Sequence, residues 1–388
     1  MTKLGIYIIG ARGNVGTCVA AGVLGLRLGD LPVTGCVTET PLFEGAELVS
    51  FGDIELGGCD VVSVELQEKA RDLALNERIL PMIVVERVSP ELKELNAKID
   101  EGIALKPGDV PQGGYRAAMD HIRNNLEAFA ERSGADQVVV VNLSSTEALI
   151  ELDDRHGTAS AFEQALKENV SGTASSTMLY AWSAISCDMP FINFTPSQAN
   201  DMAAISQFAR ERKVAHAGKD GKTGETLIKT ALAPMFAARN FNVTSWIANN
   251  YLGNGDGKTL NDPAAREAKL ASKDEALRSI LGEETHLSTK IDYVPELGDW
   301  KKAVDTIEFE GFLGTPMSMH FVWRGCDSAL AAPLVIDLAR IVERAQRAGE
   351  YGELGYLGSF FKSPLGSGEH NLHEQILMMA AHAQSWKS

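Results

Sequence analysis

The sequence has few cysteines, and those that it has form no recognisable pattern. Its 388 residues include five cysteines, which are scattered along the chain without a CxxC pair. An odd and scattered set argues against a disulfide framework and against a cysteine-based zinc motif, and it is typical of a reducing compartment. We therefore expect a cytoplasmic protein.

Long apolar runs and an excess of positive charge are also lacking. No stretch of about 20 apolar residues is present, which argues against a transmembrane helix. The N-terminus begins directly with the strand-like run LGIYIIG and carries no signal-peptide pattern. The formal net charge of −16 argues against a general nucleic-acid binder and against a protein that binds membrane surfaces. An anionic ligand would be repelled by this charge, so nearby lysines would have to hold it.

Alternating strands and helices are present in the first half of the chain. Strands are predicted at 4–9, 33–38, 61–64 and 137–142, and residues 39–60 are expected to be irregular. Helices are predicted from the glycine-rich turn to Gly29, at 65–75, 90–99 and 113–133, and over most of 159–183. This alternation predicts an α/β fold, in which a Rossmann-like, doubly wound parallel sheet carries helices on both faces.

The pattern changes after about residue 235. The runs RNFNVTSWIANNYL, STKIDYVP, AVDTIEFEGFLG and PMSMHFVW favour a mostly antiparallel sheet with one covered face, and 264–281 reads as a charged helix. The chain then returns to helix. We predict a nucleotide-binding domain built from both chain ends, with an inserted α+β catalytic domain, over residues 1–195, 196–315 and 316–388.

The segment GARGNVG is typical of a dinucleotide-binding turn, because it stands between an apolar strand and a helix. Gly10 permits the turn, Gly13 permits close approach of a pyrophosphate, and Gly16 permits packing of the helix on the strand. The polar turn NLSSTE follows the strand at 137–142, where parallel sheets bind ligands. The residues predicted to bind the cofactor are Gly10, Arg12, Gly13, Asn14, Val15, Gly16, Asp53, Asn142, Ser144 and Thr146.

The carboxylate that would hold the adenosine ribose is left open between two residues. Glu39 directly follows the predicted second strand, and Asp53 lies later in the glycine-rich stretch. A carboxylate at this position would favour NAD over NADP, because it would repel a 2′-phosphate.

Two glycine-rich polar turns, HAGKDGKTGET and YLGNGDG, lie between His216 and Gly257. The first runs into the amphipathic stretch TLIKTALAPMF, so the free N–H groups of a new helix would point into the turn. Gly224 lets the backbone close on a ligand, and Thr223 and Thr226 offer hydroxyls. This arrangement predicts a phosphate site, and the alternative is an ordinary capped helix start.

Over nearly its whole length the sequence resembles the myo-inositol-1-phosphate synthase family, also called inositol-3-phosphate synthase, in its shorter, prokaryote-like form. The matching motifs are GARGNVG, the turn at 142–147, FINFTPSQ, KDGKTGET, YLGNGDG, LGDWKKAVD, CDSALAAPLVIDL and FFKSPL. In FINFTPSQ, Phe194 and Thr195 replace small residues of the family pattern.

The resemblance implies an NAD-dependent isomerisation of D-glucose 6-phosphate to 1L-myo-inositol 1-phosphate. In this reaction C5 is oxidised, the ketone acidifies the C6 protons, the enolate attacks the C1 aldehyde, and C5 is finally reduced again. The resemblance also implies a homotetramer with contributions from the inserted sheet. Prokaryotic members can depend on a divalent metal, which leaves open Mg²⁺, Mn²⁺, Zn²⁺ or a monovalent cation. The expected partner is a small sugar phosphate, with no nucleic acid and no membrane.

The site residues follow from the matching motifs. The predicted catalytic residues are Lys269, Lys273, Lys301, Lys362, Asp220, Asp256 and Asp327. The predicted substrate- and phosphate-binding residues are Thr223, Gly224, Glu225, Thr226 and Asn254. An intramolecular aldol closure needs a proton acceptor and cations over the developing oxyanions, and lysine can serve as either. Each lysine, taken singly, is more often a solvated surface charge.

Individual roles are hypotheses. Lys273 and Lys301 would neutralise the phosphate, and Lys269 would handle the C5 hydroxyl proton. Lys362 would stabilise the oxyanion formed from the C1 aldehyde. The aspartates would orient lysines or hold a cation.

Glu225 places a carboxylate in a loop meant for a dianion. It would point away, pair with Lys222 or Lys229, or help to hold a divalent cation. His370 and His373 are three residues apart, a spacing that could suit metal ligands, but we expect them to be a pair on the surface of a helix.

Three other functions are compatible with parts of this pattern. A semialdehyde or glyceraldehyde-phosphate type dehydrogenase would need a nucleophilic cysteine, for which Cys187 is the only candidate. A non-catalytic NAD-binding regulator would leave the lysines and aspartates unexplained. A cyclase of the same family acting on a related sugar phosphate is not distinguished by the sequence.

Overall fold

The first sheet of the structure contains seven strands that pair in parallel. The computed structural model describes residues 2–29, 31–106, 108–253 and 276–387. The strand order is β11-β6-β5-β4-β1-β2-β3, so the direction of winding reverses between β1 and β4, where open α/β sheets bind their ligands. The strands are β1 (Leu4–Ile9), β2 (Ile54–Asp60), β3 (Ile99–Glu101), β4 (Gln137–Asn142), β5 (Phe191–Asn193), β6 (Ala215–Gly218) and β11 (Gly352–Glu353).

Both faces of this sheet are covered, which explains why its central strands are apolar throughout. In β1, Leu4, Ile6 and Ile8 face one core, and Tyr7 and Ile9 face the other. The first core is completed by α1 (Asn14–Arg27), α2 (Leu66–Leu75), α3 (Met82–Asn96), α11 (Asp327–Arg347) and α12 (Leu372–Ser385). The second core is completed by α4 (Gly114–Ser133), α5 (Ala159–Lys167), α6 (Ser176–Ser186) and α7 (Ala203–Arg212).

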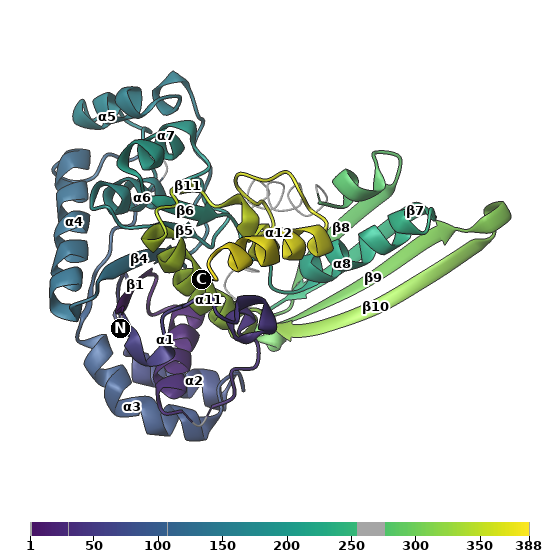
Figure 1. The fold of residues 1–388 in the computed structure, drawn as a ribbon, viewed down its shortest axis with the longest axis horizontal. Coiled ribbons are helices and arrows are strands. Elements are labelled where there is room, and N and C mark those ends of the chain that lie inside the picture. The colour runs from purple at the N-terminus through teal and green to yellow at the C-terminus, as the bar shows by residue number, and fades with distance from the viewer. Residues whose placement is uncertain (1, 30, 107, 254–275, 388) are drawn as a thin grey trace.

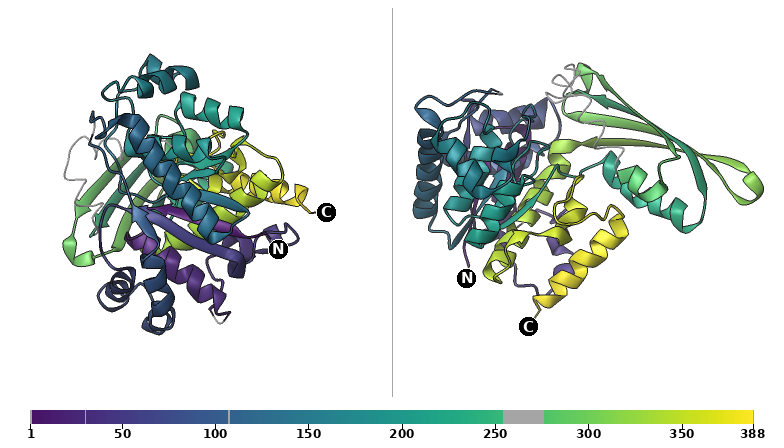
Figure 2. Two further views of the ribbon diagram at one scale, coloured as in Figure 1. Left: turned by 90° about the vertical axis from the view of Figure 1, so that its left-hand side faces the viewer. Right: turned by 90° about the horizontal axis from the view of Figure 1, so that it is seen from above.

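The second sheet has four strands in the order β10-β9-β7-β8, and it extends from the first part of the molecule as an arm (Figures 1 and 2). Its strands are β7 (Asn242–Leu252), β8 (His286–Tyr293), β9 (Trp300–Glu310) and β10 (Pro316–Cys326). The pair β7–β8 is parallel, and the other two pairs are antiparallel. Helix α8 (Glu225–Ala238) packs Phe236 against Trp246 and Phe309, so one face of the sheet is covered.

Short 3-10 helices lie in the connections. They are η1 (Val37–Glu39), η2 (Pro41–Phe43), η3 (Phe51–Asp53), η4 (Asp154–His156), η5 (Pro295–Leu297), η6 (Phe312–Gly314) and η7 (Gly355–Phe360). Among the helices in the described ranges, none is long and apolar enough to cross a membrane.

The predicted fold class is confirmed: a parallel sheet built from both chain ends carries an inserted, mostly antiparallel sheet. The change from one sheet to the other falls between β6 and β7 and again after β10, later in the chain than the predicted boundaries at 195 and 315. The predicted charged helix at 264–281 lies mostly outside the described residues. Helix α3 starts at Met82 and includes Pro90, where a helix start was predicted.

The predicted strand at 33–38 is wrong. These residues form a loop and the start of η1, and they are fastened to α11. The carboxylate of Asp337 accepts hydrogen bonds from the backbone N–H of Val37 and from the hydroxyl of Thr38. This tertiary contact overrides the β propensity of the segment.

The second strand of the sheet is β2, which lies in a stretch predicted to be irregular, and the strand predicted at 61–64 is wrong. The sequence IELGGCD has two glycines that weaken a strand signal. Both are needed for close packing, because a Cβ on Gly57 would lie 2.4 Å from the Phe129 ring, and one on Gly58 would lie 2.2 Å from the Ile8 carbonyl oxygen.

A buried histidine on β6 makes the stability of the first sheet sensitive to acid. His216 is completely buried and contacts the Asn200 amide at 3.2 Å. Burial lowers the pKa of His216 from 6.5 to about 4. Between these two values the unfolded chain takes up a proton that the folded chain refuses, so stability present above pH 6.5 is lost as the pH falls toward 4.

We predict that His216→Gln flattens this dependence. Its free energy of unfolding should fall less steeply than that of the natural chain between pH 6.5 and 4, with a difference in slope of up to about 1.4 kcal/mol per pH unit. Urea denaturation at several pH values measures it, with the exposed His373→Gln as the matched control. Equal slopes for all three proteins would contradict the prediction.

Candidate functional site

The dinucleotide-type turn leaves β1 at the reversal point of the sheet. Gly10 has φ +84°, and a Cβ on it would lie 3.1 Å from the backbone of Leu143, which follows β4. A Cβ on Gly16 would lie 2.6 Å from the Ala11 carbonyl oxygen, so this glycine lets α1 pack against the turn. Gly13 differs, because a Cβ there would meet only the Gly10 carbonyl oxygen at 3.3 Å. The space beside Gly13 is therefore available to a ligand.

A cavity of about 510 Å³ opens at the carboxyl ends of β1, β2 and β4. Its walls come from the turn after β1, the end of β2, the segment after β3, the turn after β4 and the start of α6. Of the predicted cofactor residues, Gly10, Gly13, Ser144 and Thr146 line it. The cavity has the position, the size and the glycine floor that a dinucleotide needs, and NAD fits the residues present.

Asp60 is the carboxylate at the end of β2, beside this cavity. Its Oδ2 accepts a hydrogen bond of 2.7 Å from the backbone N–H of Arg12, and its Oδ1 accepts one from Val62. The Arg12 side chain turns away and donates to Asn96 and to the Val62 carbonyl. Arg12 therefore takes part in the turn through its backbone. The sequence analysis did not propose Asp60 as a cofactor residue, because it did not predict the strand β2, which ends at Asp60.

The two carboxylates proposed from the sequence lie elsewhere. Asp53 directly precedes β2, at the amino end of that strand, whereas Asp60 is at its carboxyl end, roughly 20 Å away along the strand. It accepts a hydrogen bond from Ser50. Glu39 forms an ion pair of 2.7 Å with Arg340 on α11. Neither residue lines the cavity, so Asp60 replaces both as the candidate for the ribose.

Asn142 is completely buried, and its side chain positions the turn after β4. Its amide oxygen accepts hydrogen bonds from the backbone and the hydroxyl of Ser144. Its amide nitrogen donates to Asn193 at 3.2 Å and to Thr195 at 3.1 Å. Asn142 thus links the ends of β4 and β5. Three of the predicted cofactor residues, Asn142, Asn14 and Val15, do not line the cavity.

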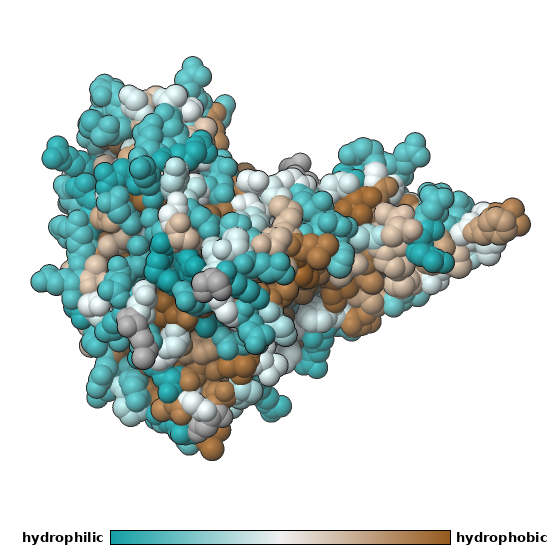
Figure 3. Space-filling model, viewed as in Figure 1, coloured by the Kyte–Doolittle hydropathy of each residue, from teal (hydrophilic) through white to brown (hydrophobic). Residues whose placement is uncertain are grey.

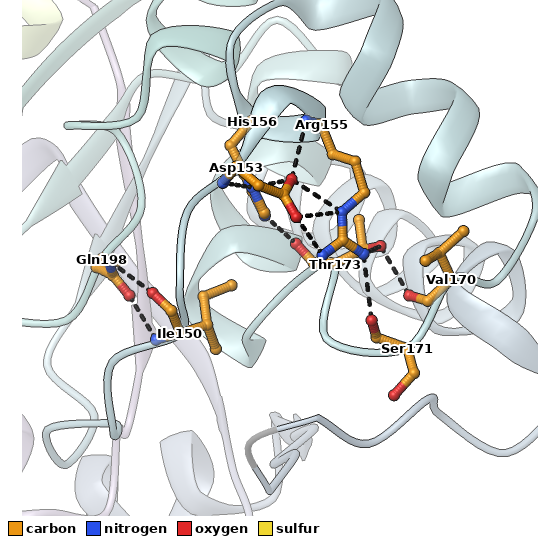
Figure 4. A network of polar contacts seen from close by, with 8 residues as sticks. All are labelled: Ile150, Asp153, Arg155, His156, Val170, Ser171, Thr173 and Gln198. Carbon is orange, nitrogen blue, oxygen red and sulfur yellow. Dashed lines mark hydrogen bonds and ion pairs between the residues drawn. The ribbon is translucent and has the colours of Figure 1, made fainter.

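The loop after β4 is fastened at several points, which gives the cavity a rigid wall. Gln198 accepts a hydrogen bond from the Ile150 N–H and donates one to the Ile150 carbonyl (Figure 4). Arg155 holds both carboxylate oxygens of Asp153 and also reaches Thr173. These hydrogen bonds to Arg155 hold the pKa of Asp153 well below its usual range. The second half of the loop is therefore anchored at Ile150 and at Arg155.

The glycine-rich loop before α8 is hydrogen-bonded on two sides. On one side, the N–H groups of Asp220 and Gly221 donate to the carbonyls of Thr195 and Phe194. On the other side, the backbone N–H of Lys222 donates to the Phe360 carbonyl, and the backbone N–H of Lys362 donates to the Asp220 carbonyl at 2.7 Å. Asp220 adopts φ +63°, a left-handed conformation that aspartate tolerates better than most residues. The loop thereby joins the end of β5 to the FFKSPL segment.

Two of the predicted lysines are held at this loop by aspartates. The Nζ atom of Lys362 donates to Asp220 Oδ1 at 2.8 Å, and both side chains are largely buried. The Nζ atom of Lys301 lies 4.0 Å from Asp327 Oδ2. The other oxygen of Asp327 accepts a hydrogen bond of 3.0 Å from the Thr223 hydroxyl. The structure thus brings Asp220, Thr223, Lys301, Asp327 and Lys362 together.

Glu225 and Lys229 form a buried ion pair of 2.8 Å in the first turn of α8. The pairing with Lys229 was one of the alternatives for Glu225. The Lys229 ammonium also lies 3.9 Å from the buried carboxylate of Asp305, so two carboxylates share it. Gly224 is the N-cap of α8, and Thr226 is the second residue of that helix. Lys222 is buried and donates to Gln375 at 2.7 Å, and burial lowers the pKa of Lys222 to about 8.

Asn250 is a buried polar residue that sequence reasoning missed. It lies on β7 opposite Ala303, and the register of β7 and β9 places it on the same face as Lys301. The side chain is completely buried, and neither atom of its amide has a hydrogen-bond partner within the described ranges. An unsatisfied buried amide beside a ligand site is a candidate ligand contact.

Four predicted site residues cannot be placed in this arrangement. Lys269, Lys273, Asn254 and Asp256 lie outside the described residues. Over the ranges that are described, no group of three or more His, Cys, Asp or Glu side chains is arranged to hold a metal ion.

Cys187 lies far from the cavity. It follows the last residue of α6, while the first residues of that helix line the cavity, about 16 Å away along the helix axis. Burial raises the pKa of the Cys187 thiol to about 11, which keeps it protonated and weakly nucleophilic. This placement weighs against the dehydrogenase alternative.

Comparisons with known proteins agree with this description of the fold. A family model described as Myo-inositol-1-phosphate synthase matches residues 4–383. The chain is 33% identical to inositol-3-phosphate synthase 1 of Bacteroides thetaiotaomicron over 95% of this chain and 91% of that protein.

Two solved structures are similar in fold. One is an inositol-3-phosphate synthase from Caenorhabditis elegans, with a TM-score of 0.89 and 21% identity, over 100% of this chain and 86% of that one. The other is a myo-inositol-1-phosphate synthase-related protein from Thermotoga maritima, with a TM-score of 0.80 and 23% identity, over 98% of both chains.

The two glycines of the turn should respond differently to the same substitution. We predict that Gly13→Ala stays as stable as the natural chain but binds NAD⁺ at least about tenfold more weakly, because its methyl group would fill the space beside the turn. Gly16→Ala should instead lower the melting temperature, because its methyl group would clash with the Ala11 carbonyl. Calorimetric binding and thermal unfolding measure both, and an unchanged affinity in Gly13→Ala would refute the assigned location.

Proposed function

The chain belongs to the myo-inositol-1-phosphate synthase family, and from this premise we propose that it converts D-glucose 6-phosphate to 1L-myo-inositol 1-phosphate with NAD as a recycled cofactor. The family match and the 33% identity to a named synthase support this activity. The observation that carries the proposal is local: two lysines are held by aspartates at one glycine-rich loop, which precedes a helix N-terminus.

The turn after β1 and Asp60 would hold the dinucleotide. Gly13 would lie against the pyrophosphate, at the N-terminus of α1, and Asp60 would accept hydrogen bonds from the adenosine ribose. When bound, the nicotinamide accepts a hydride from C5 of the sugar and returns it after ring closure. The cavity beside Ser144 and Thr146 would exclude water from that exchange.

The loop before α8 would hold the phosphate group of the sugar. The N–H groups of the first turn of α8 and the hydroxyl of Thr226 would donate to the phosphate oxygens. The Thr223 hydroxyl, which donates to Asp327, would have to turn from that carboxylate to join them. Lys301 would neutralise their charge, together with Lys273. Because the whole chain carries a net charge of −16, this local compensation is required for a dianion to bind.

Lys362 and Asp220 would act at the reacting carbons. The ammonium group of Lys362 would stabilise the oxyanion that develops on the former C1 aldehyde, and Asp220 orients it through the hydrogen bond of 2.8 Å. Lys269 would move the proton of the C5 hydroxyl. The buried amide of Asn250 would contact a sugar hydroxyl, which would satisfy its hydrogen-bonding groups.

The homotetramer is a further proposal. The connection between β9 and β10 exposes Phe312 and Leu313 at 86% and 88%, and β10 itself exposes Val322 at 63%. Figure 3 shows hydrophobic residues along the arm and at its tip. A large exposed apolar surface on a projecting sheet is typical of a subunit contact, which supports a role of the second sheet in assembly.

Incubation of the protein with D-glucose 6-phosphate and NAD⁺ tests the proposed reaction. We expect an inositol phosphate in the ¹H and ³¹P NMR spectra, without net NADH. A dehydrogenase would accumulate NADH in proportion to the substrate consumed. Turnover of another sugar phosphate alone would instead identify a related cyclase. Either of these two results would overturn the proposed reaction.

Removal of one lysine tests the assignment of the loop. We predict that Lys362→Ala lowers kcat by at least about a hundredfold, because the developing oxyanion loses its cation. The variant should still fold and should bind NAD⁺ within about threefold of the natural chain. The exposed Lys93→Ala on α3 is the matched control and should keep full turnover. Normal kcat in Lys362→Ala would show that the assigned role is wrong.

A further inference from the structure

Asp299 is a buried carboxylate at the junction of the two sheets, and neither the sequence pattern nor the proposed function assigns it a role. It lies in the turn between η5 and β9 and is only 4% exposed. Its Oδ1 accepts a hydrogen bond of 2.9 Å from the amide nitrogen of Asn14. Its Oδ2 accepts one of 3.2 Å from the thiol of Cys326. Its backbone N–H donates to Glu77 at 2.8 Å.

The partners of Asp299 belong to both parts of the site. Asn14 is the first residue of α1, in the dinucleotide turn. Cys326 is the last residue of β10 and directly precedes Asp327. Asp299 itself stands two residues before Lys301. One carboxylate therefore contacts the nucleotide turn, stands two residues before Lys301 and accepts a hydrogen bond from Cys326, the residue before Asp327.

The chemistry of these contacts suits a stable connection. An ionised carboxylate only accepts hydrogen bonds, so both side-chain partners have to donate. Burial, together with the Asp299 charge, raises the pKa of the Cys326 thiol to about 12, and the thiol therefore keeps its proton. No lysine, arginine or histidine of the described ranges forms an ion pair with Asp299, but the carboxylate lies at the N-terminus of α1, which favours negative charge.

Glu77 fixes the same turn from a second direction. Its carboxylate accepts the Asp299 N–H, and its backbone carbonyl accepts a hydrogen bond of 2.7 Å from the Trp300 indole. Residues 298–300 are thus held against the connection between α2 and α3. The Asn14–Asp299 hydrogen bond joins the dinucleotide turn to the residue directly before β9.

We propose that Asp299 is a positioning residue, which couples occupation of the dinucleotide turn to the placement of Lys301 and Asp327. This inference rests on the proposed function for the role of the lysine. A dinucleotide that orders the first turn of α1 would order the Asn14 amide, and Asp299 would pass this restraint to the start of β9. The sugar phosphate would then meet a lysine that is already in place once the cofactor is bound.

Hydrogen–deuterium exchange with NAD⁺ as the only ligand tests the coupling. In the natural chain, saturating NAD⁺ should slow exchange about tenfold or more in peptides that cover the turn at 10–16 and in those that cover 297–303. In Asn14→Ala, the turn should still be protected, whereas 297–303 should exchange as in the free protein. Asp299→Asn should behave like Asn14→Ala, because its amide can no longer accept from both donors.

The control variant is Glu296→Gln, which removes an exposed carboxylate three residues away and should keep both protections. Protection of 297–303 in both Asn14→Ala and the natural chain would overturn the proposal, and so would its absence in the natural chain. If Asp299→Asn does not fold, as judged by circular dichroism, Asn14→Ala decides the question.

The same experiment separates this inference from the proposed reaction. Exchange is measured without any sugar phosphate, so a failure to convert D-glucose 6-phosphate would leave its result intact. Conversely, a natural chain that makes inositol phosphate but shows no NAD⁺-dependent protection of 297–303 would refute the coupling alone.

Discussion

The candidate site depends on one loop, residues 218–226, being held on two sides at once. Backbone hydrogen bonds tie it to the end of β5 and to the FFKSPL segment, which is separated from it by more than a hundred residues of sequence. This arrangement places Asp220 where its side chain meets Lys362, and it directs the start of α8 toward the same space. Without either connection the loop would not bring a phosphate site and a cationic residue together.

Electrostatic compensation is the second feature that the arrangement requires. The proposed function requires an acidic chain to bind two anionic ligands, so each ammonium group near the loop would have to be placed precisely. Asp220 and Asp327 form ion pairs with Lys362 and Lys301, and the buried Lys229 forms ion pairs with both Glu225 and Asp305. A buried carboxylate without such a partner would oppose the binding of a phosphate dianion.

The parts predicted well from the sequence are those with strong local signals. The strands β1 and β4, the helix α4 and the glycine-rich turn before α1 all have the predicted type and place. The family resemblance supplied the lysines and aspartates, of which the described members meet at one loop. Asp53 and Glu39 do not line the cavity. The sequence did not reveal this, because β2 contains Gly57 and Gly58, whose packing against Phe129 and Ile8 is not visible in the sequence. Asn250 and Asp299 depend on contacts between distant segments, so periodicity could not reveal them.

The central claim is that a sugar phosphate and a dinucleotide are held together in one crevice until the hydrogen removed from C5 has been returned. The most direct measurement uses D-glucose 6-phosphate deuterated at C5, with unlabelled NAD⁺ in excess. The account predicts that the inositol phosphate keeps the deuterium on the ring carbon derived from C5. A product without deuterium, with the label found in the free dinucleotide, would contradict it.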